Sequence, residues 1–292
     1  MTHGFLVIDK PGGMTSHDVV AKIRKRLGTK RVGHAGTLDP MATGVLVIGV
    51  GNATKLMQYI VDGFKSYDAT IALGAATHTD DKEGEIISIA DPSILSAVTE
   101  DQIKKILTSF VGTILQKPSS VSAIKVDGKA AHKRVREGEV VDLPAREVTI
   151  SKIDVHQIEY TEKSILVRIS VDCSAGTYIR SIARDLGDAL SVGGHLTVLR
   201  RNLVSPFAID EAGTIEDAEL IDTAEGISRV LPTRVLDFEE MNEISFGRTI
   251  AVNAGEGIFA ALSPSHSFAA LLENKEFSGK VAAAPKLVAV QE

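Results

Sequence analysis

The sequence predicts a mixed fold of α-helices and β-strands, followed by a small β-rich region at the C-terminal end. Apolar residues recur at helical spacing after Thr15 and again after Thr99, which is typical of two amphipathic helices. Residues 147–159 and 164–172 instead alternate apolar and polar side chains, which indicates strands. Short apolar runs at residues 257–262, 268–273 and 286–290 predict a second, smaller group of strands.

Length and composition favour a globular protein of one large and one small domain. The chain has 292 residues, of which 44% are hydrophobic, so a sizeable core can form. No apolar run is long enough to span a membrane, and residues 1–13 do not resemble a signal peptide. Cys173 is the only cysteine, which excludes an internal disulfide framework and a zinc ribbon. We therefore expect a cytoplasmic protein.

The charge is unevenly distributed. The net charge is −6, but residues 1–209 carry 26 Lys and Arg against 23 Asp and Glu, whereas residues 210–292 carry 6 against 15. Basic residues cluster within residues 22–31 and again within residues 125–136. Binding to phosphates requires local positive charge rather than a positive total, so a nucleic-acid partner remains compatible with this chain. Either cluster taken alone is equally compatible with a solvated surface.

Residues 31–56 have the sequence RVGHAGTLDPMATGVLVIGVGNATKL and form the most informative stretch. The apolar run Gly44–Val50 predicts a buried strand, and the glycine-rich loop before it contains His34 and Asp39. Pro40 restricts the backbone of Asp39 to extended conformations. From the residues alone, Asp39 is either a turn residue or a carboxylate nucleophile, base or ligand. A metal site is disfavoured because no second His or Cys stands at ligand spacing.

The segment GHAGTLDPMATGVL, residues 33–46, closely resembles the active-site motif of the TruB family, the bacterial tRNA pseudouridine-55 synthases. This resemblance implies that Asp39 is the catalytic residue. It also implies that His34 packs into the RNA where the flipped uridine has left. The segment DKPGGMTS at residues 9–16 resembles the opening motif of the family, which places Lys10 near the active site.

Further motifs follow in the order found in the family. A tyrosine that stacks on the target base corresponds to Tyr67, whose hydroxyl is a candidate for proton removal; from the residues alone it is more simply a core aromatic. Asp81 corresponds to the acid of the second motif, although His78 replaces an aspartate there. The segment GTYIR implies that Arg180 pairs with Asp39 and that Tyr178 lines the uridine pocket.

Two of these positions also have simpler explanations. Arg180 lies near the predicted start of a helix at Thr177, where the helix dipole does not favour a cation, so a carboxylate partner is expected. From the residues alone, the simpler expectation is that Arg180 forms a salt bridge at the surface. Leu199 corresponds to a residue that packs on the base, and otherwise it is a core leucine.

Residues 116–143 are polar, basic and interrupted by proline and glycine. They resemble the family's RNA-gripping thumb insertion, although Val121 and His132 stand in place of the usual tyrosines. The resemblance covers residues 4–205 and weakens beyond them. We expect a catalytic domain at residues 1–230 that includes this insertion, and a PUA-like domain at residues 231–292.

The resemblance implies an α/β (α+β mixed sheet) pseudouridine synthase that isomerises uridine 55 in the T loop of tRNA by base flipping. It implies no cofactor or metal, the T-arm of tRNA as partner, and a monomer. One alternative is a non-catalytic RNA-binding or RNA-folding protein, and RNA folding can also accompany catalysis. Another is an aspartyl phosphotransferase, which is disfavoured because Met41 stands where a second acid would hold magnesium.

Overall fold

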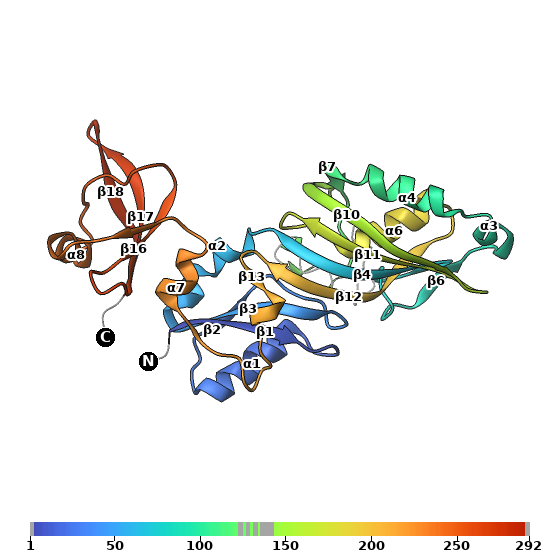
Figure 1. Ribbon diagram of the computed structural model, residues 1–292, viewed down its shortest axis with the longest axis horizontal. Helices are drawn as coiled ribbons and strands as arrows, with labels where there is room; N and C mark the ends of the chain where they lie inside the picture. Colours follow the sequence, from blue (N-terminus) through green and yellow to red (C-terminus); the bar gives the residue numbers. More distant parts are fainter. Residues whose placement is uncertain (1–2, 122–124, 127–128, 131–133, 135–142, 290–292) are drawn as a thin grey trace.

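The computed structural model describes residues 3–121, 125–126, 129–130, 134 and 143–289. Its main body is built on a ten-stranded sheet with the order β14-β1-β3-β12-β4-β11-β10-β7, to which β2 and β13 are added through β3 and β12 (Figure 1). These strands are β1 (Gly4–Lys10), β2 (Val32–Ala35), β3 (Thr43–Val50), β4 (Lys65–Leu73), β7 (Gly112–Gln116), β10 (Arg146–Tyr160), β11 (Ile165–Cys173), β12 (Gly194–Val204), β13 (Phe207–Ala208) and β14 (Ile221–Asp222).

The strand order at the centre of this sheet determines where the motifs meet. Strand β12 pairs in parallel with β3 and antiparallel with β4, so Arg201 is in register with Gly44 on one side and with Tyr67 on the other. A Cβ atom at Gly44 would lie 2.1 Å from the Arg201 carbonyl oxygen, and the φ of Gly44 is +99°. Only glycine fits this close approach, which brings the start of β3 against β12.

Helices cover both halves of the main sheet, and the last helix along the chain belongs to the C-terminal region. They are α1 (Ser16–Leu27), η1 (Gly51–Leu56), α2 (Met57–Val61), α3 (Pro92–Ser96), α4 (Glu100–Ser109), α6 (Ile179–Ala189), α7 (Thr223–Ser228) and α8 (Phe238–Ser245), with a short turn η2 (Ile209–Glu211). Helix α1 has Thr15 as its N-cap residue and is followed by Gly28 in the left-handed conformation. Its apolar face packs on one side of β1 and β3, while η1 and α2 pack on the other.

Two sequence predictions were wrong in detail. His34 lies on strand β2 rather than in a loop, because residues 32–35 pair with β3 in a register that sets His34 opposite Ile48. The glycines on either side of His34 had indicated a loop, but the hairpin with β3 satisfies the backbone here. Helix α6 begins at Ile179 and not at Thr177, with Tyr178 as its N-cap residue.

The other predicted elements were confirmed. Strand β3 covers the apolar run 44–50, α4 follows its cap Thr99, and β10 and β11 cover the two alternating segments. A small two-stranded sheet, β5 (Ala75–Thr77) and β6 (Ile86–Ile89), flanks the second motif. Most of the predicted thumb at residues 116–143 lies outside the described residues, which include only its beginning, its last residue, Arg134 and the short strands β8 (Lys125–Val126) and β9 (Lys129–Ala130).

The C-terminal region forms a separate four-stranded sheet in the order β15-β16-β17-β18. The three predicted apolar runs fall in β16, in β17 and at the end of β18, whereas β15 was not predicted. The strands are β15 (Thr233–Val235), β16 (Ile258–Leu262), β17 (Phe268–Phe277) and β18 (Lys280–Val288). Ala260 and Leu271 of this sheet share a buried cluster with Phe5 of β1, and the sheet lies beside α7 and α2 at one end of the molecule (Figure 1). No helix in the described part of the chain is long and apolar enough to cross a membrane.

Candidate active site

The backbone around Asp39 is held by the first residue of α1. The Leu38 N–H donates to Ser16 Oγ at 2.9 Å, and the Ser16 hydroxyl donates to the Leu38 carbonyl at 3.1 Å. On the other side of Asp39, the Ala42 N–H donates to its carbonyl at 3.1 Å. Both flanks of the residue are therefore fixed by hydrogen bonds, which limits the positions open to its carboxylate.

Arg180 contacts the Asp39 carboxylate through two nitrogen atoms. Its Nε lies 2.9 Å from Oδ2, and its Nη2 donates to Oδ1 at 3.3 Å. Such a two-point contact fixes the plane of the carboxylate as well as its position. The arginine side chain is 6% exposed, whereas the aspartate side chain is 31% exposed. Asp39 therefore presents an accessible carboxylate on a buried support, and its pairing with Arg180 is the one that the motif resemblance implied.

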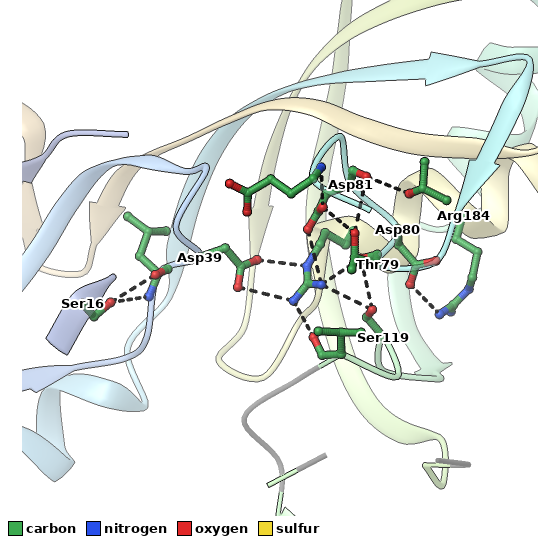
Figure 2. A network of polar contacts seen from close by, with 12 residues as sticks. Ser16, Asp39, Thr79, Asp80, Asp81, Ser119 and Arg184 are labelled. Atoms are coloured by element: carbon green, nitrogen blue, oxygen red, sulfur yellow. Dashed lines mark hydrogen bonds and ion pairs between the residues drawn. The ribbon is translucent and has the colours of Figure 1, made fainter. Parts of the chain in front are cut away.

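The same guanidinium is fixed from behind by the second motif (Figure 2). Arg180 Nη1 donates to the Thr79 carbonyl at 2.8 Å and lies 3.5 Å from Asp81 Oδ2. Asp81 in turn accepts a hydrogen bond of 2.6 Å from the Thr79 hydroxyl and one of 3.0 Å from the Glu83 N–H. Asp81, which corresponds to the acid of the second motif, is buried and faces Arg180. The replacement at His78 leaves this contact in place.

The Val121 carbonyl accepts a further hydrogen bond of 2.9 Å from Arg180 Nη2. Because it is the main chain of Val121 that is used, the absence of the usual tyrosine side chain does not remove this support. The structure thus joins Val121, near the start of the predicted thumb, directly to the arginine that holds Asp39.

Gln116, at the end of β7, positions the start of α6. Its side-chain amide donates to the Tyr178 carbonyl at 3.1 Å and accepts from the Tyr178 N–H at 2.8 Å. The Ser181 hydroxyl adds a bond of 3.0 Å to the Lys117 carbonyl. These contacts fix the helical turn that carries Tyr178 and Arg180. Sequence reasoning missed both Gln116 and Ser16, because their partners lie 62 and 22 residues away and no local pattern marks them.

Lys10 lies beneath the Asp39 loop and is completely buried. Its ammonium donates to the carbonyls of Met14 at 2.7 Å, Pro11 at 2.8 Å and Pro40 at 3.3 Å. Burial lowers the pKa of Lys10 to about 8, and the negative charge of Asp39 acts in the opposite direction. Lys10 was predicted to lie near the site, and it does so as a support that ties the first motif to the residue after Asp39.

His34 lies on β2, and its imidazole is partly buried. Burial lowers the pKa of His34 to about 4, with the neighbouring His17 acting in the same direction, so the ring is neutral at physiological pH. The two rings meet edge to face with their centroids 5.5 Å apart. The His34 Nδ1 atom is buried and has no hydrogen-bond partner among the described residues.

Tyr67 and Leu199 come from the neighbouring strands β4 and β12 and are 7% and 6% exposed. Both belong to the cluster that also contains Leu38 and Met41, on either side of Asp39 in the sequence. Burial raises the pKa of the Tyr67 hydroxyl, and the positive charge of Arg201 partly opposes this effect. The structure thus places an apolar and aromatic surface next to the loop that carries the carboxylate.

The residues singled out from the sequence therefore differ in how they are connected to Asp39. Asp39, Arg180 and Asp81 form one ion-pair network, and Tyr178 is the cap residue of the helix that presents Arg180. Tyr67 and Leu199 adjoin the same loop through apolar packing, whereas His34 lies on the strand that precedes it. Within the described residues, no group of three or more His, Cys, Asp or Glu side chains is arranged to hold a metal ion.

Comparison with known proteins gives consistent results. Residues 24–179 match the TruB family pseudouridylate synthase, N-terminal domain. The tRNA pseudouridine synthase B of Corynebacterium diphtheriae is 49% identical over 277 residues, which cover 93% of this chain and 92% of that protein. The protein of the same name from Arthrobacter sp. is 49% identical over 287 residues, covering 93% of each chain.

Solved structures show the same fold. A chain of the archaeal box H/ACA Nop10–Cbf5 complex aligns with a TM-score of 0.70 and 24% identity, covering 98% of this chain and 85% of that one. An H/ACA ribonucleoprotein bound to a substrate RNA gives the same TM-score at 23% identity, covering 98% of this chain and 84% of that one. The mixed fold and the pseudouridine synthase class predicted from the motifs are confirmed, and the chain belongs to the TruB family of pseudouridylate synthases.

Proposed function

We propose that this protein isomerises uridine 55 in the T loop of tRNA to pseudouridine, with Asp39 as the catalytic carboxylate. The relatives named tRNA pseudouridine synthase B support tRNA as the substrate. The observation that carries the proposal is the two-point contact of a 6% exposed arginine with a 31% exposed aspartate side chain. This arrangement orients an ionised carboxylate while leaving it open to a bound nucleotide.

The reaction needs an ionised carboxylate. Its atoms and electrons balance without any reactant other than the tRNA. The bond between the ribose C1′ and uracil N1 breaks, the uracil turns, and a bond forms between C1′ and C5. The proton on C5 is then lost and N1 gains one, so the product is an isomer of the substrate. An ionised Asp39 serves each of three routes: attack on C1′, attack on uracil C6, or removal of a ribose proton to give a glycal.

Base flipping is supported by the character of the surrounding side chains. Extruding a base from a folded loop costs a few kcal/mol, which contacts in the pocket and in the vacated gap must offset. A neutral imidazole at His34 can fill such a gap without the cost of burying a charge. Tyr67 and Leu199 supply an aromatic and an apolar surface for the base. Tyr178 is the N-cap residue of the helix that presents Arg180, and we assign it to the wall of the same pocket. A dry pocket also holds the detached uracil until it is recaptured.

We assign Lys10 and Asp81 to positioning rather than to RNA contact. Each is at most 4% exposed and already bonded, to three carbonyls in one case and to Arg180 and its neighbours in the other. We further propose a cytoplasmic monomer that needs no cofactor and binds the T-arm. Residues 1–230 would form the catalytic domain, and residues 231–292 a PUA-like domain.

The test uses the purified full-length chain and an unmodified tRNA transcript carrying tritium at uridine C5, in buffer with EDTA. We expect about one tritium released to water per tRNA, with pseudouridine mapped by mass spectrometry to position 55 of the T loop. A second transcript with cytidine at position 55 should release nothing from the T loop. A folded protein that binds tRNA without releasing tritium would overturn the proposal and favour the RNA-folding alternative.

A further inference from the structure

Arg201 is a second buried arginine that none of the motif comparisons assigned. It is 1% exposed and is the bulkiest of the fully buried side chains in the described part of the protein. Arg180 has two carboxylate partners, but Arg201 forms no ion pair within the described residues. Burying a cation without a counter-ion has a large desolvation free energy, which an apolar side chain of the same length would avoid. Its retention therefore requires an explanation other than stability.

The hydrogen bonds of Arg201 join the two ends of the Asp39 loop. Its Nη2 donates to the Gly36 carbonyl at 3.1 Å, immediately after β2, and its Nε donates to the Val45 carbonyl at 2.8 Å, near the start of β3. A Cβ atom on Gly36 would lie 3.7 Å from Arg201 Nη1, so the guanidinium packs against this turn. Asp39 lies between the two bonded carbonyls. One rigid, planar group thus sets the separation of the ends of the loop.

Arg201 also adjoins Tyr67. The two residues are directly opposite each other in the antiparallel pair β4–β12, and their side chains therefore lie on the same face of the sheet. The guanidinium charge lowers the pKa of the Tyr67 hydroxyl against the raising effect of burial. Arg201 is thus connected both to the loop that carries the carboxylate and to the tyrosine proposed to contact the base.

We propose that Arg201 is a positioning residue for catalysis, which holds both ends of the Asp39 loop and orients the Tyr67 hydroxyl beneath the target base. This inference rests on the proposed function, because it presumes that Asp39 and Tyr67 act on a bound uridine. It assigns the arginine a role in the chemical step and not in tRNA binding, since the buried guanidinium has no access to RNA.

Three variants of the full-length protein test this role: Arg201→Met, Arg201→Lys and the control Arg200→Met. Arg200 precedes Arg201 on β12 and pairs instead with Asp9 at 2.8 Å on the partly exposed surface. Single-turnover rates with saturating enzyme, tRNA Kd values and pH–rate profiles are measured for each. We expect Arg201→Met to lower the single-turnover rate by about 30- to 100-fold with the tRNA Kd changed by less than about threefold. Arg200→Met should change the rate by less than about threefold.

The lysine variant and the pH profile separate positioning from simple structural support. If Tyr67 accepts the C5 proton, loss of the Arg201 charge raises its pKa further, so the midpoint of the pH–rate profile should move to higher pH in Arg201→Met. Arg201→Lys keeps the charge and should restore the midpoint, and its single-turnover rate should be about three- to tenfold higher than that of Arg201→Met. If Arg201→Met fails to fold, Arg201→Lys decides the result. A lysine ammonium cannot bond the Gly36 and Val45 carbonyls in the fixed geometry of the guanidinium, so this variant should remain about tenfold slower than the wild type.

Several results would overturn the inference. It fails if the wild type releases tritium normally and Arg201→Met does the same at an unchanged pH midpoint. It also fails if the rate loss is matched by an equal loss of tRNA affinity. If the wild type itself releases no tritium, the proposed function fails first, and the two failures are therefore distinguishable.

Discussion

The sheet that carries the site and the C-terminal sheet bury very different side chains. Beneath the site, the buried residues include three cations that are not paired with acids: Lys10 and Lys65, whose ammonium groups donate to backbone carbonyls, and Arg201. From residue 231 to residue 289, the only buried polar residue is Asn253, and the core consists of alanine, leucine, isoleucine and phenylalanine. The arginines of this region, Arg234 and Arg248, pair with glutamates and are not buried.

We interpret the buried cations beneath the site as residues that serve catalysis, and the apolar core of the C-terminal sheet as residues that serve stability. Buried charges contribute little net stability, because their desolvation offsets their attraction. Apolar burial stabilises by about 25 cal/mol per Å² of surface removed from water. We therefore expect changes in the charged set to affect turnover more than tRNA binding, and changes in the C-terminal core to affect stability more than turnover. Four substitutions test this division, in order of decreasing effect.

Among the residues that position Asp39, Arg180 should have the largest effect. Arg180→Met removes the two-point contact and leaves Asp81 buried without its partner, so kcat should fall by about 10³-fold and stability by about 3–5 kcal/mol. Arg180→Lys keeps the charge without the planar fork and should lose about 10²-fold in kcat while remaining folded. Steady-state kinetics and chemical denaturation measure both. A lysine variant with wild-type kcat would show that the two-point geometry is unimportant.

Gln116 should have a smaller effect of the same kind. Gln116→Ala leaves the N–H and carbonyl of Tyr178 without their side-chain partners, at a cost of about 1–3 kcal/mol in stability. The start of α6 should then shift enough to lower kcat by about tenfold without a matching rise in the tRNA Kd. Gln157→Ala, on the exposed face of β10, is the matched control. Equal kinetics for the two variants would remove Gln116 from the positioning set.

In the C-terminal sheet, Leu271 should show the opposite behaviour. It is 1% exposed and lies in the cluster that joins β17 to β1. Leu271→Ala should lower the unfolding free energy by about 2–5 kcal/mol through the cavity that it leaves, with kcat unchanged at a temperature where the protein remains folded. Val281→Ala, at 56% exposed in the same sheet, should cost less than about 0.5 kcal/mol. A large fall in kcat for folded Leu271→Ala would contradict the expectation that the C-terminal core affects stability and not turnover.

Lys65 provides the smallest expected effect, which depends on pH. Its ammonium donates to the carbonyls of Val61 at 2.7 Å and Gly63 at 2.8 Å, and burial lowers its pKa from 10.5 to about 8. Because the unfolded chain then binds more protons than the folded protein between about pH 8 and pH 10.5, this group makes the fold more stable as the pH rises through that window. The Tm of the wild type relative to Lys65→Met should therefore increase over this range. A constant difference would contradict the burial of a charged lysine.

Local patterns predicted local features well. Short-range spacing predicted the helices that follow Thr15 and Thr99, the buried strand β3 and the alternating strands β10 and β11, and all of them were confirmed. The motif resemblance further supplied the pairing of Arg180 with Asp39, which lie 141 residues apart. The division of the chain near residue 230 and the catalytic roles stay predictions.

The supports of the site could not be predicted, because they depend on strand order. Nothing in residues 194–204 indicates that β12 lies between β3 and β4, and only that position brings Arg201 to Gly36, Val45 and Tyr67. Likewise, Gln116 meets Tyr178 only because β7 lies at the edge of the sheet beside the start of α6. His34 was misassigned for the same reason, since its pairing with β3 outweighed the loop signal of the neighbouring glycines.

The measurement that tests the central claim most directly is single-turnover pseudouridine formation by Asp39→Ala, with tRNA binding and Tm measured on the same preparation. The account predicts a folded protein with tRNA affinity within about threefold of the wild type and with product formation lowered by more than about 10⁴-fold. Product formation near the wild-type rate would show that another group performs the chemistry. Loss of binding together with activity would show that Asp39 serves to hold RNA and not to act on it.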